Sequence, residues 1–278
     1  MDIKRYLHFV DNASLAPRGT PGYDKLGKVR PVLEHMTERF KSVYNPGRDI
    51  AVDEAMVKFQ GRSTLKQYMP KKPTKRGIKV WVLAESSTGY FSRLEVYTGK
   101  KANKKAEKGL GEKVVKSLTQ DFHNRWHRCY FDNFFTSKSL LCELLEVGVY
   151  SIGTARSNRK LFPEALKKTK LDKRQECTLR QYYRMSSLFL RRGDMLSVQS
   201  GHISATAWHD TKEVVCMYSG FSPLDLTTVK RRQKTGAQQD VPCSAAMAAY
   251  NQHMGGVDRG DQLRGYYHRH TKSRKFYR

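Results

Sequence analysis

The order of β-forming and helix-forming segments between residues 49 and 155 constrains the fold more than any other feature of the chain. Three β-forming runs come first, "DIAVDEAMVKF", "IKVWVLAES" and "GYFSRLEVYTG", and the glycine and serine between the last two favour an antiparallel hairpin. A helix ("LGEKVVKSLTQDF"), a strand ("HRCYFDN"), a helix ("SKSLLCELLEVG") and a strand ("VYSIGTARSN") follow. This β-β-β-α-β-α-β order predicts an α/β fold, an RNase H-like mixed sheet with flanking helices.

The composition of the other segments predicts four parts. Residues 1–48 are a helical lead-in, since "KVRPVLEHMTERFKSVY" has apolar residues at helical spacing. Residues 49–156 form the first part of the core. Residues 157–240 are expected to be a β-containing inserted subdomain and a basic linker ("TVKRRQKTGAQQDVP"), with the last strand of the insertion possible in the core sheet. Residues 241–278 return to a helical pattern, which Gly255 and Gly256 interrupt.

The charge of the chain points to a polyanionic partner. Lys and Arg number 52 against 26 Asp and Glu, a formal net charge of +26, so nucleic acid is the first candidate and a membrane surface a weaker one. The sequence shows neither a run of apolar residues that could span a bilayer nor a signal peptide. The cysteines are scattered and odd in number, which indicates reduced thiols in the cytosol or nucleus and no zinc site: Cys129, Cys142, Cys177, Cys216 and Cys243.

Four aspartates stand at positions that suit metal chemistry. Asp53 is in the middle of the first predicted strand, Asp132 ends the fourth, and Asp258 opens a helical segment with Asp261 on the same face. In an RNase H-like sheet the first and fourth strands are neighbours, and a helix could bring Asp258 to them. Two Mg²⁺ ions, roughly 3.5–4 Å apart, promote phosphodiester cleavage and need few carboxylate ligands. The pattern therefore suggests a metal-dependent nuclease.

Each aspartate also has a purely structural interpretation. Asp53 could lie on the exposed face of an edge strand, and Asp132 with Asn133 could form a turn and a helix cap. Asp258 could cap a helix, and Asp261 could pair with Arg264. Composition and spacing alone leave these alternatives open.

Three blocks resemble the piggyBac transposase family, in the same order and over most of residues 40–278. "VDEAMVKFQGRSTLKQYMPKKPTKRGIKVWVLAES" is similar to the block around the first catalytic aspartate of that family, and "YFDNFFTSKSLLCELLEVGVYSIGTARSNRK" to the block around the second. "YNQHMGGVDRGDQLRGYY" resembles the third block, in which a G-G-V-D-x-x-D-Q pattern supplies two acidic residues.

The resemblance implies an RNase H-like DDE/D catalytic domain with an inserted subdomain. Asp53, Asp132 and Asp258 would hold Mg²⁺, with Mn²⁺ as a substitute, and Asp261 would be the additional acidic residue. Members of the family bind terminal inverted repeats in double-stranded DNA, nick them, form hairpinned ends and insert at TTAA. They act as dimers, so the resemblance implies a homodimer for the full-length protein. It also implies a nuclear location.

The resemblance also assigns residues to DNA binding. Arg156, Asn158 and Arg159 match a "T-x-R-S-N-[KR]" stretch that touches DNA in the family. Asn133 would orient Asp132 or approach the DNA. A further basic group would contact phosphates or form a solvated loop: Lys75, Arg76 and Lys79. An aromatic group would stack on bases or, as we favour, pack: Tyr266, Tyr267 and His268.

The chain is shorter than the members that it resembles. Family members carry an N-terminal region and a C-terminal zinc-binding domain, so truncation at both ends is expected. Two functions follow: an active transposase domain, or a domesticated or truncated DNA-binding protein without catalysis. An RNA-binding module is weaker, because the sequence has neither an aromatic RNP pattern nor a GXXG loop.

Overall fold

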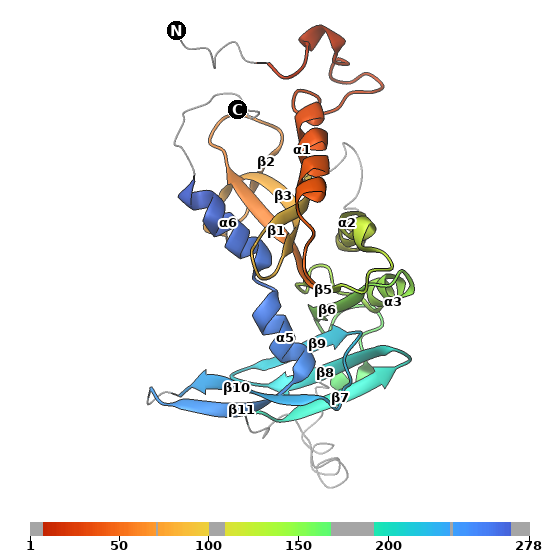
Figure 1. Cartoon of the computed structure of the whole chain (residues 1–278), viewed down its shortest axis with the longest axis vertical. Helices are drawn as coiled ribbons and strands as arrows, with labels where there is room; N and C mark the ends of the chain where they lie inside the picture. The colour runs from red at the N-terminus through yellow and green to blue at the C-terminus, as the bar shows by residue number, and fades with distance from the viewer. Residues whose placement is uncertain (1–7, 71, 100–108, 168–191, 234–235, 268–278) are drawn as a thin grey trace. The chain divides into compact units, whose positions relative to one another are not determined.

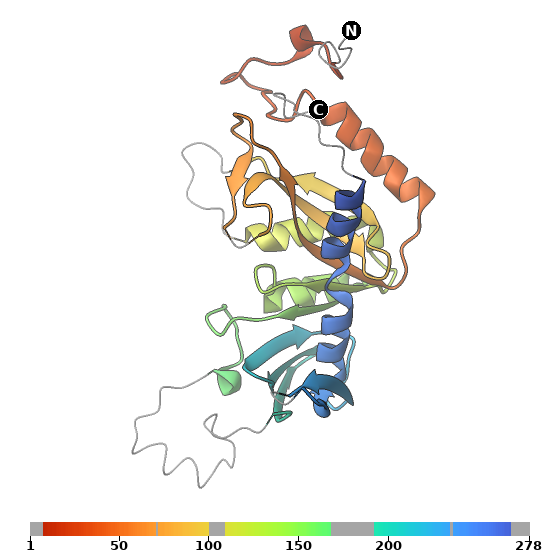
Figure 2. The ribbon, with the colours of Figure 1, turned by 90° about the vertical axis from the view of Figure 1, so that its left-hand side faces the viewer.

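The structure is a computed structural model that describes residues 8–70, 72–99, 109–167, 192–233 and 236–267 (Figures 1 and 2). The chain forms two compact units. Unit 1 comprises residues 1–47, 52–108 and 256–278, and unit 2 comprises residues 48–51 and 109–255. The strand β1 (Asp49–Lys58) begins in unit 2 and continues in unit 1 from Val52.

Among its described residues, unit 1 contains four sheet strands, two α-helices and one 3-10 helix. Its strands are β1, β2 (Lys66–Tyr68), β3 (Arg76–Glu85) and β4 (Phe91–Val96), and its helices are α1 (Arg30–Val43), α6 (Gly256–Tyr266) and the short 3-10 helix η2 (Asn12–Ser14). The strand β3 lies beside β1 and pairs antiparallel with both β2 and β4. The predicted hairpin is therefore confirmed. One core cluster contains Ala55, Val80, Val82, Ala84 and Val257, so both β1 and α6 pack on β3 and β4.

Unit 2 continues from the start of β1 into a second group of strands. They are β5 (Arg128–Phe131), β6 (Tyr150–Thr154), β7 (Met195–Ser200), β8 (Ile203–His209), β9 (Glu213–Tyr218), β10 (Leu226–Arg232) and β11 (Gln238–Ser244). The helices are α2 (Leu110–Thr119), α3 (Lys138–Glu146), α5 (Ala245–His253) and the 3-10 helices η3 (Gln120–Phe122) and η4 (Glu164–Leu166). The strand order is β1-β5-β6-β9-β8-β7, and β10 pairs only with β11.

The β5-α3-β6 segment is a parallel crossover unit. Strands β5 and β6 pair in parallel, with Tyr130 opposite Ile152, and α3 connects them. The side chain of Ser137 caps α3 by accepting a hydrogen bond from the Leu140 N–H at 3.1 Å. Leu140, Leu141 and Leu144 form the buried face of the helix. The strands and helices predicted for residues 49–155 are thus confirmed, with Asp132 directly after β5.

Two segments differ from the prediction. Residues 66–68, expected in a proline-broken loop, form the three-residue strand β2. The basic segment expected as a linker forms most of the β10–β11 hairpin, in which Val229 faces Val241. Beside β6, the strands β9, β8 and β7 extend the sheet by successive antiparallel pairs.

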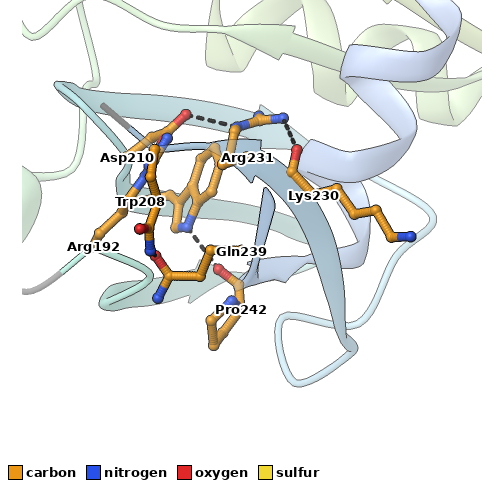
Figure 3. A network of polar contacts seen from close by, with 8 residues as sticks. Arg192, Trp208, Asp210, Lys230, Arg231, Gln239 and Pro242 are labelled. Atoms are coloured by element: carbon orange, nitrogen blue, oxygen red, sulfur yellow. Dashed lines mark hydrogen bonds and ion pairs between the residues drawn. The ribbon is translucent and has the colours of Figure 1, made fainter. Parts of the chain in front are cut away.

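A network of polar contacts explains why the basic hairpin is a folded element (Figure 3). Asp210 accepts hydrogen bonds from Arg192 at 2.6 Å and from Arg231 of β10 at 2.9 Å. The Arg231 guanidinium also lies 5.4 Å from the ring centroid of Trp208, whose indole N–H donates to the Pro242 carbonyl at 2.8 Å. Arg231 therefore points into the fold of unit 2, where its charge is neutralised, rather than into solvent.

No helix in the described part of the chain is long and apolar enough to cross a membrane. Within the described ranges the cysteines Cys129, Cys142, Cys216 and Cys243 are free thiols; Cys177 lies outside them. Burial raises the pKa of the Cys216 thiol to about 12 and that of Cys243 to about 11. These thiols are therefore protonated at neutral pH and suit a packing role.

Candidate active site

The strand β1 places two adjacent carboxylates in a nearly buried position. Ile50, Ala51 and Val52 are fully buried, and the next two side chains, Asp53 and Glu54, are only 14% and 15% exposed. Asp53 accepts a hydrogen bond from the Glu54 N–H at 2.8 Å. Two carboxylates taken out of water at one place are costly unless a cation compensates them.

Lys72 provides that cation. Its Nζ lies 3.8 Å from Asp53 Oδ2 and 3.9 Å from Glu54 Oε1, and it donates to the Glu54 carbonyl at 3.3 Å. Burial alone would lower the pKa of Lys72, but attraction to the carboxylates of Asp53, Glu54, Asp258 and Asp261 outweighs burial and raises the pKa. The Lys72 ammonium thus lies beside the carboxylates of Asp53 and Glu54, and the negative charges of Asp258 and Asp261 on α6 also act on it.

The helix α6 carries Asp258 and Asp261, and two glycines dock it on unit 1. A Cβ on Gly256 would lie 2.9 Å from the Glu85 carbonyl oxygen, and a Cβ on Gly260 would lie 2.2 Å from the ring of Phe91. Only glycine allows so close an approach, and Val257 between them is buried. Because this face of α6 is docked, the orientation of the helix is fixed. Asp258, in the first turn, is exposed on the opposite face.

Arg264 connects α6 to the strand that carries Asp53. Its guanidinium lies 3.0 Å from Asp261 Oδ1 and donates to the Met56 carbonyl of β1 at 3.0 Å. The pair between Asp261 and Arg264, which was the structural alternative for Asp261, is therefore present. Because Arg264 binds both elements, the orientation of Asp261 depends on β1.

Asp132 belongs to unit 2, where it shapes the turn that leads into α3. Its Oδ1 accepts from the Phe134 N–H at 2.8 Å, and its carbonyl accepts from the Thr136 hydroxyl at 2.9 Å. The turn expected at Asp132 and Asn133 is thus present. Within the described residues the Oδ1 of Asn133 is buried and has no hydrogen-bond partner, which leaves an acceptor available next to Asp132.

The structure thus places Asp53, Asp258 and Asp261 in unit 1, with Asp53 Oδ2 3.8 Å from Lys72 Nζ, and it places Asp132 in unit 2. Glu54 and Lys72 had no role in the sequence-based prediction. Their only signal was the Asp-Glu pair within a strand and a lysine-rich loop after Tyr68. Among the residues that the structure describes, no three His, Cys, Asp or Glu side chains form a group that could hold a metal ion.

The predicted DNA-binding residues have different surroundings. Arg156 and Asn158 are exposed, as are Lys75 and Arg76. Arg159 instead donates to the carbonyls of Asn133 and Phe134, at 2.5 and 2.6 Å, so it holds the turn after Asp132.

Aromatic rings contact two of the basic residues, and the Arg76 guanidinium lies 5.4 Å from the ring centroid of Tyr68. The Lys79 ammonium lies 3.6 Å from the ring centroid of Trp81, a cation–π contact. The predicted packing of Tyr266 and Tyr267 is wrong, because these side chains are 81% and 86% exposed. His268 lies outside the described residues.

Comparison with known proteins relates the chain to transposases and transposable element-derived proteins. A family model described as "Transposase IS4" matches residues 1–278. The human "PiggyBac transposable element-derived protein 3" is 31% identical over 277 residues, which are 98% of this chain and 43% of the human protein. The human "PiggyBac transposable element-derived protein 2" is 27% identical over 282 residues, 99% of this chain and 44% of that protein.

A solved structure shares the fold. The cryo-EM structure of a piggyBac transposase synaptic complex with hairpin DNA is 25% identical and has a TM-score of 0.76, covering 98% of this chain and 51% of the solved chain. The likeness agrees with the RNase H-like fold expected from the order of the strands. The chain spans less than half the length of the human relatives and about half that of the solved one.

Proposed function

Because the chain belongs to the Transposase IS4 family, among its piggyBac-like members, we propose that it is a transposase catalytic domain that cuts and transfers DNA strands with divalent metal ions. The observation that carries the proposal is the pair of nearly buried carboxylates, Asp53 and Glu54, beside the Lys72 ammonium, whose pKa the charges of Asp258 and Asp261 also raise. Carboxylates with so little exposure are costly to fold unless a cation compensates them.

We propose Asp53, Asp132 and Asp258 as the metal ligands and Asp261 as the additional acidic residue. Mg²⁺, or Mn²⁺ in its place, would activate the attacking oxygen and stabilise the leaving oxygen of the phosphodiester. The chain itself fixes the ligands. The rigid strand β1 holds Asp53, the glycine-docked helix α6 holds Asp258, and Arg264 orients Asp261.

We propose double-stranded DNA as the substrate, at terminal repeats and TTAA target sites. The net charge of +26 supports a polyanionic partner, and the solved relative is a synaptic complex with hairpin DNA. Homodimer formation and a nuclear location, which the family resemblance implies, are further parts of the proposal. Arg156 and Asn158, both exposed, are proposed phosphate or base contacts.

Thermal unfolding with and without Mn²⁺ tests the metal site. A ligand that binds only the folded state stabilises it by about 2.7 kcal/mol at one hundred times its Kd. We expect Mn²⁺ to raise the Tm of the wild-type chain, and we expect Asp53→Asn and Asp258→Asn to abolish that increase. Asp121→Asn, at an exposed position of η3, is the control and should keep it. Nicking of supercoiled DNA should follow the same pattern.

A second candidate function is a transposase-derived DNA-binding protein without catalysis. Lys72 favours it, because its ammonium, 3.8 Å from Asp53 Oδ2 and 3.9 Å from Glu54 Oε1, supplies positive charge beside these two carboxylates. A folded wild-type chain that binds DNA, but neither gains stability from Mn²⁺ nor nicks DNA, would replace the first proposal with this one.

A further inference from the structure

Unit 1 contains a basic pocket that the proposed metal site does not use. It has a volume of about 570 Å³ and is lined by the end of β1, by β2 and by the loop that enters β3. This volume falls within the roughly 300–1,000 Å³ that is usual for small-ligand sites. The lining includes four cationic side chains: Lys58, Lys66, Lys75 and Arg76. Among the described residues, the lining contains no carboxylate that would neutralise them.

An aromatic ring is presented in the same lining. Tyr68 is 63% exposed, so its ring is accessible from solvent. Tyr68 pairs with Arg76 across β2 and β3, and the Arg76 guanidinium lies 5.4 Å from the centroid of its ring. Lys66, two residues before Tyr68, points to the same side of the strand. One face of β2 therefore combines a ring with positive charge.

Backbone geometry keeps the pocket in shape. A Cβ on Gly77 would lie 2.2 Å from the Val57 carbonyl oxygen, so β1 and β3 approach each other more closely there than a side chain would allow. This close approach brings Lys58, next to Val57, and Arg76, next to Gly77, to one pocket. Lys66 is also held in place, since its Nζ donates to the Gly61 carbonyl at 3.0 Å.

We propose that this pocket binds an unpaired segment of DNA, with one base stacked on Tyr68 and the flanking phosphates on the lysines. Proteins that bind single strands combine a basic groove with an exposed aromatic ring, because every base has a face that can stack. A paired base is not available for such stacking, so the pocket distinguishes single-stranded from duplex DNA. The inference rests on the proposed DNA-processing function, because cutting a duplex exposes unpaired nucleotides.

Fluorescence anisotropy with the full chain tests the inference, using a labelled short oligothymidylate and a blunt duplex. Loss of a stacked base costs about fivefold or more in affinity. We expect Tyr68→Ala to weaken oligothymidylate binding by at least that factor and to leave duplex binding unchanged. Tyr68→Phe keeps the ring and should bind both probes like the wild type. Tyr23→Ala, at another exposed tyrosine of unit 1, is the control and should change neither.

The lysines give a second, independent readout. Each lost phosphate contact should reduce the salt dependence of single-strand binding by about 0.7 in the slope of log K against log salt. We therefore expect Lys75→Gln to lower that slope. If Tyr68→Ala binds oligothymidylate as the wild type does while duplex binding persists, the pocket is not a stacking site and the inference alone fails. If the wild-type chain binds neither probe, the proposed function fails as well.

Discussion

Lys72 is the residue whose replacement separates the charge balance of unit 1 from its packing. Lys72→Met replaces the ammonium group with an apolar side chain of similar length. Asp53 and Glu54 are then left without their cation. Because the lysine side chain is 25% exposed, we expect a loss of about 1–3 kcal/mol in the free energy of unfolding, below the value for a fully buried pair. Urea unfolding measures it. Lys75→Met, at an exposed position of the same loop, should change it by less than about 0.5 kcal/mol.

The same substitution has a distinctive consequence for metal binding. An incoming Mn²⁺ no longer has to displace a positive charge, so the Mn²⁺-induced rise in Tm should be larger in Lys72→Met than in the wild type. An equal or smaller rise would show that the ammonium and the metal ion do not compete for the same carboxylates.

Asp210 in unit 2 makes stability depend on pH. Burial would raise its pKa, but hydrogen bonds from Arg192 and Arg231 outweigh burial and hold the pKa of Asp210 below its usual range. A carboxylate with a lowered pKa stabilises the fold above its unfolded-state pKa of about 3.9 and loses that contribution as pH falls through the folded value. Asp210→Asn should therefore cost about 1–3 kcal/mol at pH 7 and progressively less below about pH 4.

Denaturant unfolding between pH 7 and the acid limit checks this difference. Asp240→Asn, at an exposed position of β11, is the matched control and should follow the wild-type curve. A gap between wild type and Asp210→Asn that stays constant down to low pH would show that the Asp210 carboxylate is not the titrating group.

Among the elements, α6 depends most directly on residues without a side chain. Gly260→Ala would place a methyl group 2.2 Å from the Phe91 ring and 2.5 Å from the Gly89 carbonyl oxygen, so we expect a loss of about 1–3 kcal/mol from overpacking. Gly265→Ala is the matched control on the same helix, because nothing lies within 4 Å of the Cβ that this substitution adds. It should be neutral or stabilising by up to about 1 kcal/mol. Thermal unfolding of both variants compares them.

A further readout separates docking from general stability. If α6 shifts on β3, Asp258 and Asp261 move with it, so Gly260→Ala should also weaken Mn²⁺ binding while Gly265→Ala leaves it unchanged. Equal Mn²⁺ affinities in the two variants would show that the docked position of α6 does not matter for the carboxylates.

The elements that sequence predicted correctly are those with a clear apolar pattern. Strands β1, β3 and β5 carry runs of buried residues, and α3 repeats leucine on one face, so burial and periodicity point to the same answer. Strand β2 was missed because "KQY" is short, polar and stabilised by pairing with β3, which sequence does not show. The β10–β11 hairpin was missed because Arg231 finds its partner Asp210 far along the chain.

The candidate site was predictable only in part, for a related reason. The positions of Asp53 in a strand and of Asp258 in a helix follow from local patterns and from the family blocks. The role of Lys72 does not, because it arises from a loop folding back on β1. For Arg159, the motif that contains it suggested a contact with DNA. In the structure its guanidinium donates hydrogen bonds to two backbone carbonyls of its own unit, which the motif did not indicate.

For the whole molecule, the net charge of +26 favours a polyanionic partner, and the salt dependence of binding would report how many phosphates the chain contacts. A protein that contacts 6–10 phosphates of a duplex loses about 10³–10⁵ in affinity between 50 and 200 mM salt. We expect a steep dependence of this kind for the wild-type chain, measured by anisotropy with a duplex. Arg156→Gln removes one exposed cation and should lower the slope by about 0.9. A nearly flat dependence would argue against DNA as the partner.

Because unit 1 consists of the stretches 1–47, 52–108 and 256–278, its last stretch is translated long after the first two. Translation of the residues between β4 and α6, most of which belong to unit 2, takes on the order of ten seconds. During this interval Asp53 and Glu54 have been made and Lys72 with them, whereas Asp258 and Asp261 do not yet exist. Lys72 is therefore available to Asp53 and Glu54 before Asp258 and Asp261 have been translated.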